Sequence, residues 1–168
     1  PVNDAPVLDD IETQFMNEDD TFEFNILGSD VDEDNLLYSV SIQTDVQSYD
    51  VEGNTLTISP LENMNGEIEV QVEVSDGELI DSGTFTLNVI AQPDPPEMLD
   101  ISDQEVNEDE NFVTFLNATD VDGDELSFYG SSNIDGTSIS IEDNLMIVDP
   151  PQDYYGDMIV TAGVTDGI

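Results

Sequence analysis

The sequence contains no lysine, arginine or histidine, although 41 of its 168 residues are aspartate or glutamate. Its formal net charge at pH 7 is therefore −41. Proteins that bind nucleic acid or an anionic membrane surface contact phosphate groups with basic side chains, so this composition argues against both partners. It also removes salt bridges between side chains as a means of balancing the acidic charge.

Cysteine is absent as well, which excludes disulfide bonds and thiolate metal sites. No apolar run approaches the roughly 20 residues that a membrane-spanning helix needs, so we expect no direct membrane insertion. The sequence shows neither a signal peptide nor an initiating methionine, and we expect it to be a piece of a longer protein. With 38% hydrophobic residues, the chain can still form two small cores.

A shift of 90 positions aligns the chain with itself without a gap. The acidic stretch Asp30-Val31-Asp32-Glu33-Asp34 falls on Asp120-Val121-Asp122-Gly123-Asp124, and residues 74–77 (VSDG) fall on residues 164–167 (VTDG). A fixed period of this size indicates two copies of one domain joined by a short connector. We therefore predict two domains, at residues 1–92 and 93–168.

Apolar and polar residues alternate through most of both repeats. Ile68, Val70 and Val72, for example, are separated by Glu69 and Gln71, which is the pattern of a strand with one buried face. Seven strands are predicted in the first repeat, centred on residues 11–15, 21–27, 37–42, 48–51, 55–59, 68–74 and 83–89. The predicted fold class is all-β, with two tandem seven-stranded Greek-key β-sandwiches of the cadherin or Ig type.

The second repeat is expected to differ from the first in two ways. The match to residues 83–89 would begin at position 173, so the second domain should lack its last strand and expose a sheet edge. Either the sequence stops at an arbitrary boundary, which we favour, or another chain supplies the strand. Val113 and Phe115 occupy the positions of Glu23 and Asn25, and we predict a one-residue register shift there, with an apolar surface as the alternative.

Strand parity places the acidic residues at the two ends, or poles, of each sandwich. If the chain reverses direction at every connection, three segments share one pole. They are the segment before the first predicted strand, the loop between the second and third strands, and the loop between the sixth and seventh strands. We expect this N-terminal pole of the first repeat to hold Asn3, Asp4, Asp30, Asp32 and Asp76. The opposite pole should hold Glu18, Asp19 and the loop with Glu62 and Asn63, and should face Asp94, Asp120, Asp122 and Asp166 of the second repeat.

Close carboxylates without basic partners must protonate, spread into solvent or share a cation. Calcium takes six to eight oxygen ligands at 2.3 to 2.6 Å and tolerates irregular mixtures of carboxylate and carbonyl groups. Magnesium prefers a tighter octahedron, while zinc and iron prefer nitrogen or sulfur donors. The sequence therefore predicts Ca²⁺ as the bound ion.

Several of these stretches resemble the calcium motifs of cadherin repeats. Residues 27–32 (LGSDVD) and 118–122 (ATDVD) resemble the cadherin Asp-x-Asp motif, and residues 1–6 (PVNDAP) resemble the cadherin linker. The whole chain is similar to the cadherin-like tandem repeats of very large bacterial surface proteins and adhesins. This resemblance implies an extracellular β-sandwich in which interdomain calcium stiffens a long stalk that serves adhesion or a biofilm matrix.

The resemblance also implies further ligands and shows two departures. Glu18 and Glu108 resemble the early glutamate of cadherin repeats, and Asp76 and Asp166 resemble the late aspartate. In the middle linker, however, Pro93 replaces Asn3 and removes one side-chain ligand. Glu62 is only a loose candidate for the glutamate of the cadherin Asp-Arg-Glu motif, and its counterpart is Gln152. We therefore expect fewer than three ions at the junction between repeats.

Three classes of function follow from these observations. The first is a calcium-stiffened structural or adhesive segment of a large extracellular protein at the cell surface. Its expected partners are neighbouring repeats of the same chain, and homophilic or filament contacts with other copies are a further candidate. The alternative is a calcium-dependent glycan-binding module of a secreted protein, although the chain has no tryptophan. An enzyme is disfavoured, because there is no histidine or lysine and no sign of a carboxylate pair in a dry pocket.

Overall fold

The computed structural model describes residues 2–168, which form strands and loops without a helix. The described part of the chain thus contains no helix able to span a membrane. The chain divides into two compact units, unit 1 ending at Gln92 and unit 2 comprising Pro93–Ile168. The prediction of an all-β protein built from β-sandwiches is confirmed.

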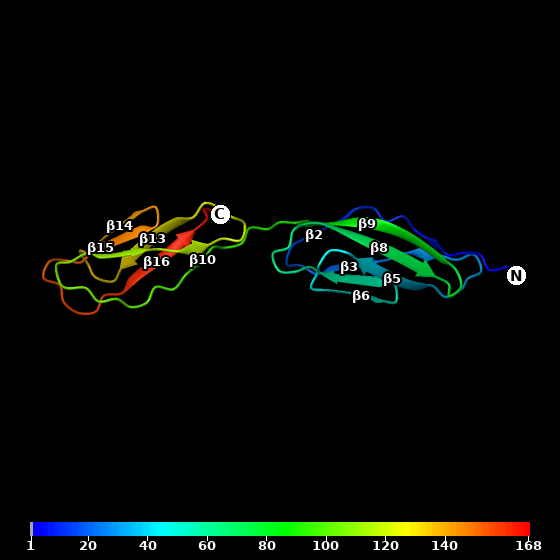
Figure 1. Ribbon diagram of the computed structural model, residues 1–168, viewed down its shortest axis with the longest axis horizontal. Helices are drawn as coiled ribbons and strands as arrows, with labels where there is room; N and C mark the ends of the chain where they lie inside the picture. The colour runs from blue at the N-terminus through cyan, green and yellow to red at the C-terminus, as the bar shows by residue number, and fades with distance from the viewer. Residues whose placement is uncertain (1) are drawn as a thin grey trace. The chain divides into compact units, whose positions relative to one another are not determined.

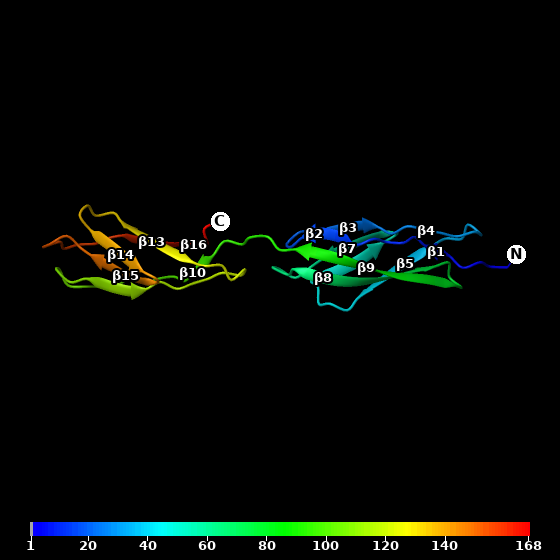
Figure 2. The same cartoon turned by 90° about the horizontal axis from the view of Figure 1, so that it is seen from above.

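Unit 1 is a sandwich of two sheets (Figure 1, Figure 2). One sheet has the order β2-β9-β8-β5 and the other has the order β3-β7-β6. The bounds are Gln14–Asn17 (β2), Phe22–Asn25 (β3), Leu37–Ile42 (β5), Ser48–Glu52 (β6), Thr55–Ser59 (β7), Gly66–Ser75 (β8) and Ile80–Ile90 (β9). Two short strands, Val7–Leu8 (β1) and Gly28–Ser29 (β4), pair with each other beside these sheets.

Successive strands of the two sheets of unit 1 run in opposite directions, as the sequence analysis predicted. All pairs in the two sheets are antiparallel except β2 and β9, which are parallel, as the first and seventh strands of an alternating series must be. The predicted first strand at residues 11–15 is misplaced, because β2 begins only at Gln14 and continues to Asn17. Parallel pairing with Leu87–Ile90 of β9 fixes this position, and sequence alternation gives no information on that partner.

The core of unit 1 consists of the inward-facing residues of both sheets. The side chains that are completely buried are Ile26, Leu56, Ile58, Ile68, Val70, Val72, Val74 and Leu87. In β8 these alternate with Glu67, Glu69 and Gln71, which are exposed as predicted. Burying an aliphatic side chain of this size contributes about 1.5–3 kcal/mol, which supports a small sandwich without disulfide bonds.

Unit 2 repeats most of this architecture. Its strands are Glu97–Met98 (β10), Phe112–Phe115 (β11), Ala118–Thr119 (β12), Ser127–Ser132 (β13), Ser138–Glu142 (β14), Leu145–Asp149 (β15) and Val160–Thr165 (β16). One sheet has the order β11-β15-β14, and β13 pairs with β16 in the other. Among the described residues of unit 2 no strand corresponds to β9, and residues 104–107, the counterpart of its partner β2, form no strand either.

The predicted register shift in unit 2 is wrong. Phe112 pairs with Val148 just as Phe22 pairs with Ile58, so the two repeats have the same register. Val113 and Phe115 therefore lie on the outer face and are 52% and 62% exposed. Because the register is the same, the residues of unit 2 that correspond to core residues of unit 1 still face inward. The outer surface of unit 2 is apolar at this place as a result.

Candidate calcium sites

The loop between β4 and β5 folds around the carboxylate of Asp30. One oxygen, Oδ1, accepts hydrogen bonds from the backbone amides of Asp32 (2.8 Å) and Asp34 (3.3 Å). This is an Asx turn, in which a side chain replaces a backbone acceptor. The other oxygen, Oδ2, is buried and receives no hydrogen bond from the described residues.

The same loop needs a left-handed backbone at its fourth position. Glu33 adopts φ = 63° there, a conformation that is costly for a residue with a Cβ atom, whereas the counterpart in unit 2 is Gly123 with φ = 78°. The backbone therefore keeps the same path in both repeats although the residue differs. This path brings the three aspartates of each loop together.

The first residues of the chain lie against this loop, at the N-terminal pole of unit 1. The amide of Asp4 donates to Oδ2 of Asp32 (2.8 Å), and the side-chain amide of Asn3 donates to Oδ2 of Asp76 (2.9 Å). Residues from three distant parts of the sequence thus meet at one end of the sandwich. These are the five residues that parity assigns to that pole: Asn3, Asp4, Asp30, Asp32 and Asp76.

Asp76 is held in its charged form by the turn between β8 and β9. The amides of Leu79 and Glu78 each donate to Oδ1 at 2.7 Å and lower the pKa of the Asp76 carboxyl, with a smaller contribution from the side chain of Asn3. A charged carboxylate is the form that binds a hard cation. Asp76 is therefore a fixed anionic group at the same pole as the loop that contains Asp30, Asp32 and Asp34, which we call the aspartate loop of unit 1.

The loops that contain Asp30, Asp32 and Asp34 in unit 1 and Asp120, Asp122 and Asp124 in unit 2 have an oxygen spacing that is compatible with a calcium ion. Asp30, Asp32 and Asp34 each offer a carboxylate oxygen, and the three oxygens lie within 4.8 Å of one another. Asp120, Asp122 and Asp124 of unit 2 show the same arrangement. Oxygens bound to one ion at 2.3 to 2.6 Å are separated by up to about 5 Å, so both groups fit Ca²⁺. The third aspartate of each group was not among the predicted ligands, although its spacing of two from Asp32 or Asp122 was a usable signal.

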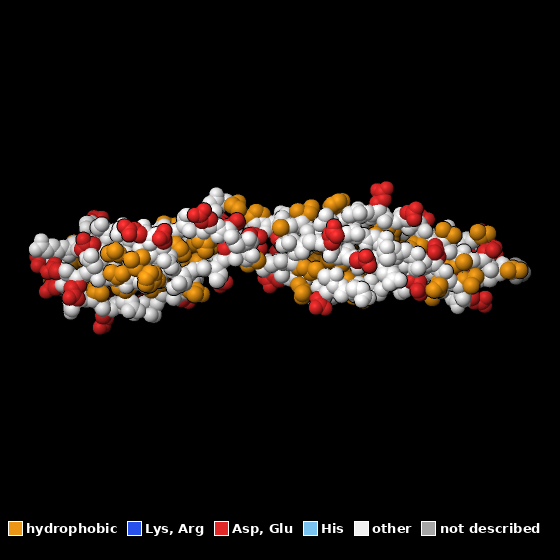
Figure 3. Space-filling model, turned by 45° about the horizontal axis from the view of Figure 1, so that its top comes forward, with side chains coloured by type: hydrophobic (Ala, Val, Ile, Leu, Met, Phe, Trp, Pro, Cys, Tyr) orange, Lys and Arg blue, Asp and Glu red, His pale blue; other side chains and the backbone are white. Residues whose placement is uncertain are grey.

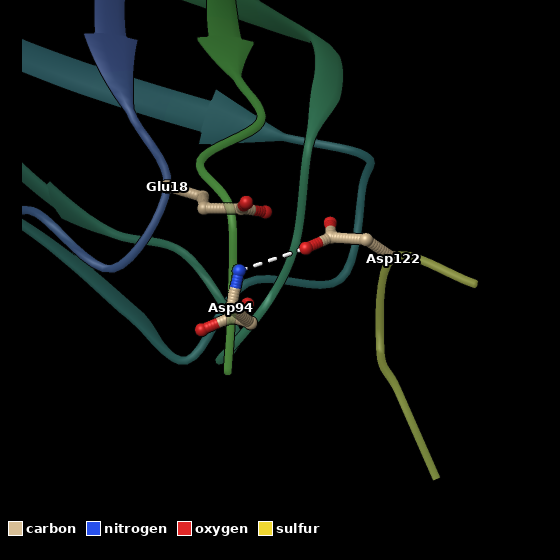
Figure 4. Close-up of side chains that lie close together, drawn as sticks. All are labelled: Glu18, Asp94 and Asp122. Atoms are coloured by element: carbon tan, nitrogen blue, oxygen red, sulfur yellow. Dashed lines mark hydrogen bonds between the residues drawn. The ribbon is translucent and has the colours of Figure 1, made fainter. Parts of the chain in front are cut away.

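Unit 2 reproduces several of the contacts of the N-terminal pole. The amide of Asp94 donates to Oδ2 of Asp122 at 2.8 Å, the counterpart of the bond from Asp4 to Asp32 (Figure 4). Oδ1 of Asp120 accepts from Asp124 (3.1 Å), and Oδ2 of Asp120 is buried without a hydrogen bond from the described residues. Pro93 has no side-chain donor to replace Asn3, and the late aspartate, Asp166, accepts the amide of Ile168 (3.0 Å).

Glu18 lies at the opposite pole of unit 1, directly after β2 (Figure 4). It is 4% exposed and is the one buried charged side chain among the described residues. Its carboxylate accepts hydrogen bonds from the amide of Gln92 (2.5 Å) and from Nδ2 of Asn65 (3.2 Å). A buried carboxylate with neutral donors and no basic partner is costly, which makes Glu18 a good candidate to bind a cation.

Glu62 and Glu108 do not share this environment. Glu62 is exposed and lies with Asp19 and Asp20 along a shallow groove, outside the groups of carboxylates that are close enough together to hold a metal ion. Glu108 is exposed as well. Its counterpart Glu18 accepts the amide of Gln92, which follows β9.

Comparison with known sequences identifies the family. The sequence profile described as a bacterial Ig domain matches residues 3–88, just over half of the chain. The chain belongs to the bacterial Ig domain family. The matched bacterial Ig domain contains all seven strands of the two sheets of unit 1, apart from the last two residues of β9. Among curated proteins, no sequence is similar enough to count as a relative of the chain.

Solved structures show the same fold as this bacterial Ig domain protein. The EC1-2 fragment of human protocadherin-24 matches with a TM-score of 0.60 and 15% identity, over 96% of this chain and 94% of the fragment. Drosophila N-cadherin EC1-4 also matches with a TM-score of 0.60, at 16% identity, over 97% of this chain and 48% of that structure. The chain thus spans about half of the N-cadherin structure. The expected likeness to cadherin-like bacterial repeats is confirmed at the level of fold.

Proposed function

We propose that this chain is a calcium-stiffened structural segment of an extracellular bacterial adhesive protein. The observation that carries the proposal is the pair of buried oxygens Oδ2 of Asp30 and Oδ2 of Asp120, which receive no hydrogen bond from the described residues. Each belongs to a group of three aspartates with the spacing of a calcium site. The sequence has no basic side chain that could pair with these oxygens, and a bound cation is the partner that we propose for them.

The ligands within each unit are assigned from their contacts. In unit 1 the ion is bound by Asp30, Asp32 and Asp34, with Asp76 as an adjacent anionic group and Asn3 and Asp4 as the segment that closes the pole. In unit 2 the corresponding ligands are Asp120, Asp122 and Asp124, with Asp94 and Asp166 beside them. The bound calcium supplies positive charge and fixes loop conformation, and no covalent chemistry is required of it.

We further propose that the ion in unit 2 serves the junction between the units. Glu18 accepts the amide of Gln92, and only Pro93 separates Gln92 from Asp94 in the sequence. The amide of Asp94 in turn donates to Asp122 of the aspartate loop. Calcium shared by Asp122, Asp94 and Glu18 would restrict the linker, and this is how a tandem of such domains becomes stiff. The loss of the Asn3 counterpart at Pro93 favours fewer than three ions there.

Isothermal titration calorimetry of the whole chain with calcium tests this proposal. We expect saturable binding of calcium, weaker binding of magnesium, and loss of the tighter calcium site in the Asp120→Asn variant. Glu69→Gln is the matched control, because it also removes one negative charge but lies on the exposed face of β8. If Asp120→Asn and Glu69→Gln bind calcium as the wild type does, the assignment is wrong.

The stiffening is tested separately by small-angle X-ray scattering in calcium and in EGTA. We expect a narrower distribution of intramolecular distances in calcium, with Glu18→Gln reducing the difference between the two conditions. Calcium binding without any change in scattering would keep the metal sites and reject the junction role.

A further inference from the structure

The outer face of the β11-β15-β14 sheet in unit 2 carries four neighbouring apolar side chains. Val113 pairs with Ile147, and Phe115 pairs with Leu145 across the same two strands. Their inward-facing neighbours Met146 and Val148 are buried, so these four residues point away from the core. We call Val113, Phe115, Leu145 and Ile147 the unit 2 patch.

The members of the unit 2 patch are accessible to solvent. Val113 is 52% exposed and Phe115 is 62% exposed, while Leu145 and Ile147 in the central strand are half-buried. The space-filling view shows hydrophobic side chains gathered on the surface of unit 2 with acidic side chains around them (Figure 3). Exposed aromatic and aliphatic side chains that adjoin one another are typical of interaction sites.

Unit 1 provides an internal comparison at the equivalent positions. The residues that correspond to the unit 2 patch are Glu23, Asn25, Thr55 and Thr57, and they pair in the same register between β3 and β7. All four are polar, and the hydroxyl of Thr55 donates to Oδ1 of Asn25 at 2.9 Å. The fold thus accepts a polar outer face at this place. The apolar face of unit 2 is therefore a property of its sequence that folding does not require.

The charge around the patch indicates what kind of partner fits. Glu142 pairs with Leu145 on the neighbouring strand, and Asp149 continues the outer face of β15 beyond Ile147. The chain as a whole carries a formal charge of −41 with no basic residue. A second copy would bring the same negative charge to the interface and be repelled, whereas a partner with basic residues would be attracted.

We propose that the unit 2 patch is a docking surface for a partner protein that presents apolar side chains flanked by lysine or arginine. The apolar side chains would cover Val113 and Phe115, and the basic ones would lie against Glu142 and Asp149. The inference adds a partner to the adhesive role proposed above, and it rests on a sheet face that contributes none of the calcium ligands. Calcium binding and docking therefore succeed or fail independently.

Peptide binding to the isotope-labelled whole chain, followed by NMR, tests this inference. The probe is a synthetic peptide of about ten residues that alternates leucine and lysine, with serine–lysine and leucine–glutamate peptides as controls. We expect the leucine–lysine peptide to shift the amide signals of 112–115 and 145–147 in calcium and in EGTA alike. The serine–lysine peptide should bind weakly and without preference for these residues, and the leucine–glutamate peptide should not bind.

Two reciprocal variants exchange the faces of the two units. Val113→Glu with Phe115→Asn installs the unit 1 residues, and the affinity for the leucine–lysine peptide should fall at least about tenfold. Glu23→Val with Asn25→Phe should create a second site for the same peptide on unit 1. This second variant keeps the test decisive if the first variant proves less stable than the wild type.

Several results would overturn the proposal. Equal affinity of the wild type and the Val113→Glu, Phe115→Asn variant would show that the peptide binds elsewhere. Equal binding of the serine–lysine and leucine–lysine peptides would show that charge alone is responsible. Reversible dimerisation of the wild type in sedimentation velocity, abolished by the same two substitutions, would show that a second copy occupies the face.

Discussion

Replacement of Asp30 by asparagine is expected to have opposite effects on stability in EGTA and in calcium. Asparagine keeps an acceptor for the amides of Asp32 and Asp34 but places a neutral amide group where Oδ2 stands. Without calcium, the substitution removes repulsion within the aspartate loop. With calcium, it removes a central ligand. The two conditions should therefore rank the wild type and the variant in opposite orders.

The magnitude in EGTA follows from the spacing of the oxygens. Two unit charges at 4.8 Å, the largest separation of the oxygens in this group, repel by about 0.9 kcal/mol in water, and Asp30 has two such neighbours, Asp32 and Asp34. Physiological salt reduces this repulsion by roughly half. The unfolded chain retains part of it, because the three aspartates are close in sequence. We therefore expect Asp30→Asn to raise the free energy of unfolding of unit 1 by about 1 kcal/mol in EGTA.

The magnitude in calcium follows from linkage between binding and folding. A ligand at 100 times its Kd stabilises the folded state by about 2.7 kcal/mol when the unfolded state does not bind it. If Asp30→Asn no longer binds at that concentration, it loses this gain and keeps the relief of repulsion. The variant should then be about 1.7 kcal/mol less stable than the wild type in calcium.

Urea unfolding followed by circular dichroism measures both values, with calorimetry to separate the transitions of the two units. Glu69→Gln on the exposed face of β8 is the control, and its effect should be the same in EGTA and in calcium. Equal calcium stabilisation of the wild type and Asp30→Asn would refute the reasoning. A variant that is less stable in EGTA would show that Oδ2 of Asp30 already has a favourable partner in the folded unit.

Four further outcomes are expected. The amides of Leu79 and Glu78 lower the pKa of the Asp76 carboxyl. The charged Asp76 therefore stabilises the folded state above pH of about 4, and this stabilisation is lost as the pH falls further and the carboxyl is protonated. The difference in Tm between the wild type and Asp76→Asn should accordingly narrow on acidification below pH of about 4. Glu33→Gly should raise the unfolding free energy by up to about 1 kcal/mol, because it removes a left-handed glutamate. Leu56→Ala should lower it by about 2–5 kcal/mol through a core cavity, measured in urea. A glycan array in calcium should show no bound glycan, and EGTA-sensitive binding there would favour a lectin-like role.

Sequence alone predicted much of the fold because one physical rule dominates it. In a half-buried strand the side chains alternate between core and solvent, so β5 and β7 lie at the predicted residues, and β8 is extended only slightly beyond its prediction. The same alternation, counted through the connections, placed Asn3 beside Asp76 and Asp4 beside Asp32. Long-range proximity was predictable here because each connection reverses the chain.

Features that depend on a specific partner strand could not be predicted in this way. β2 lies three residues later than expected at its start, because parallel pairing with β9 sets its register. The shift proposed for Val113 and Phe115 rested on the assumption that apolar residues face inward. That rule holds for the core, but it does not forbid exposed apolar side chains, which make up much of any protein surface.

Burial in unit 1 shows the same dependence on neighbours. Val70 and Val72 of β8 are fully buried, and β9 pairs with β8 over its full length. Glu18 is buried as well, and its carboxylate accepts the amide of Gln92 in the chain that follows β9. Alternation in the sequence therefore predicts which residues can be buried, and the strand that packs beside them decides whether they are buried.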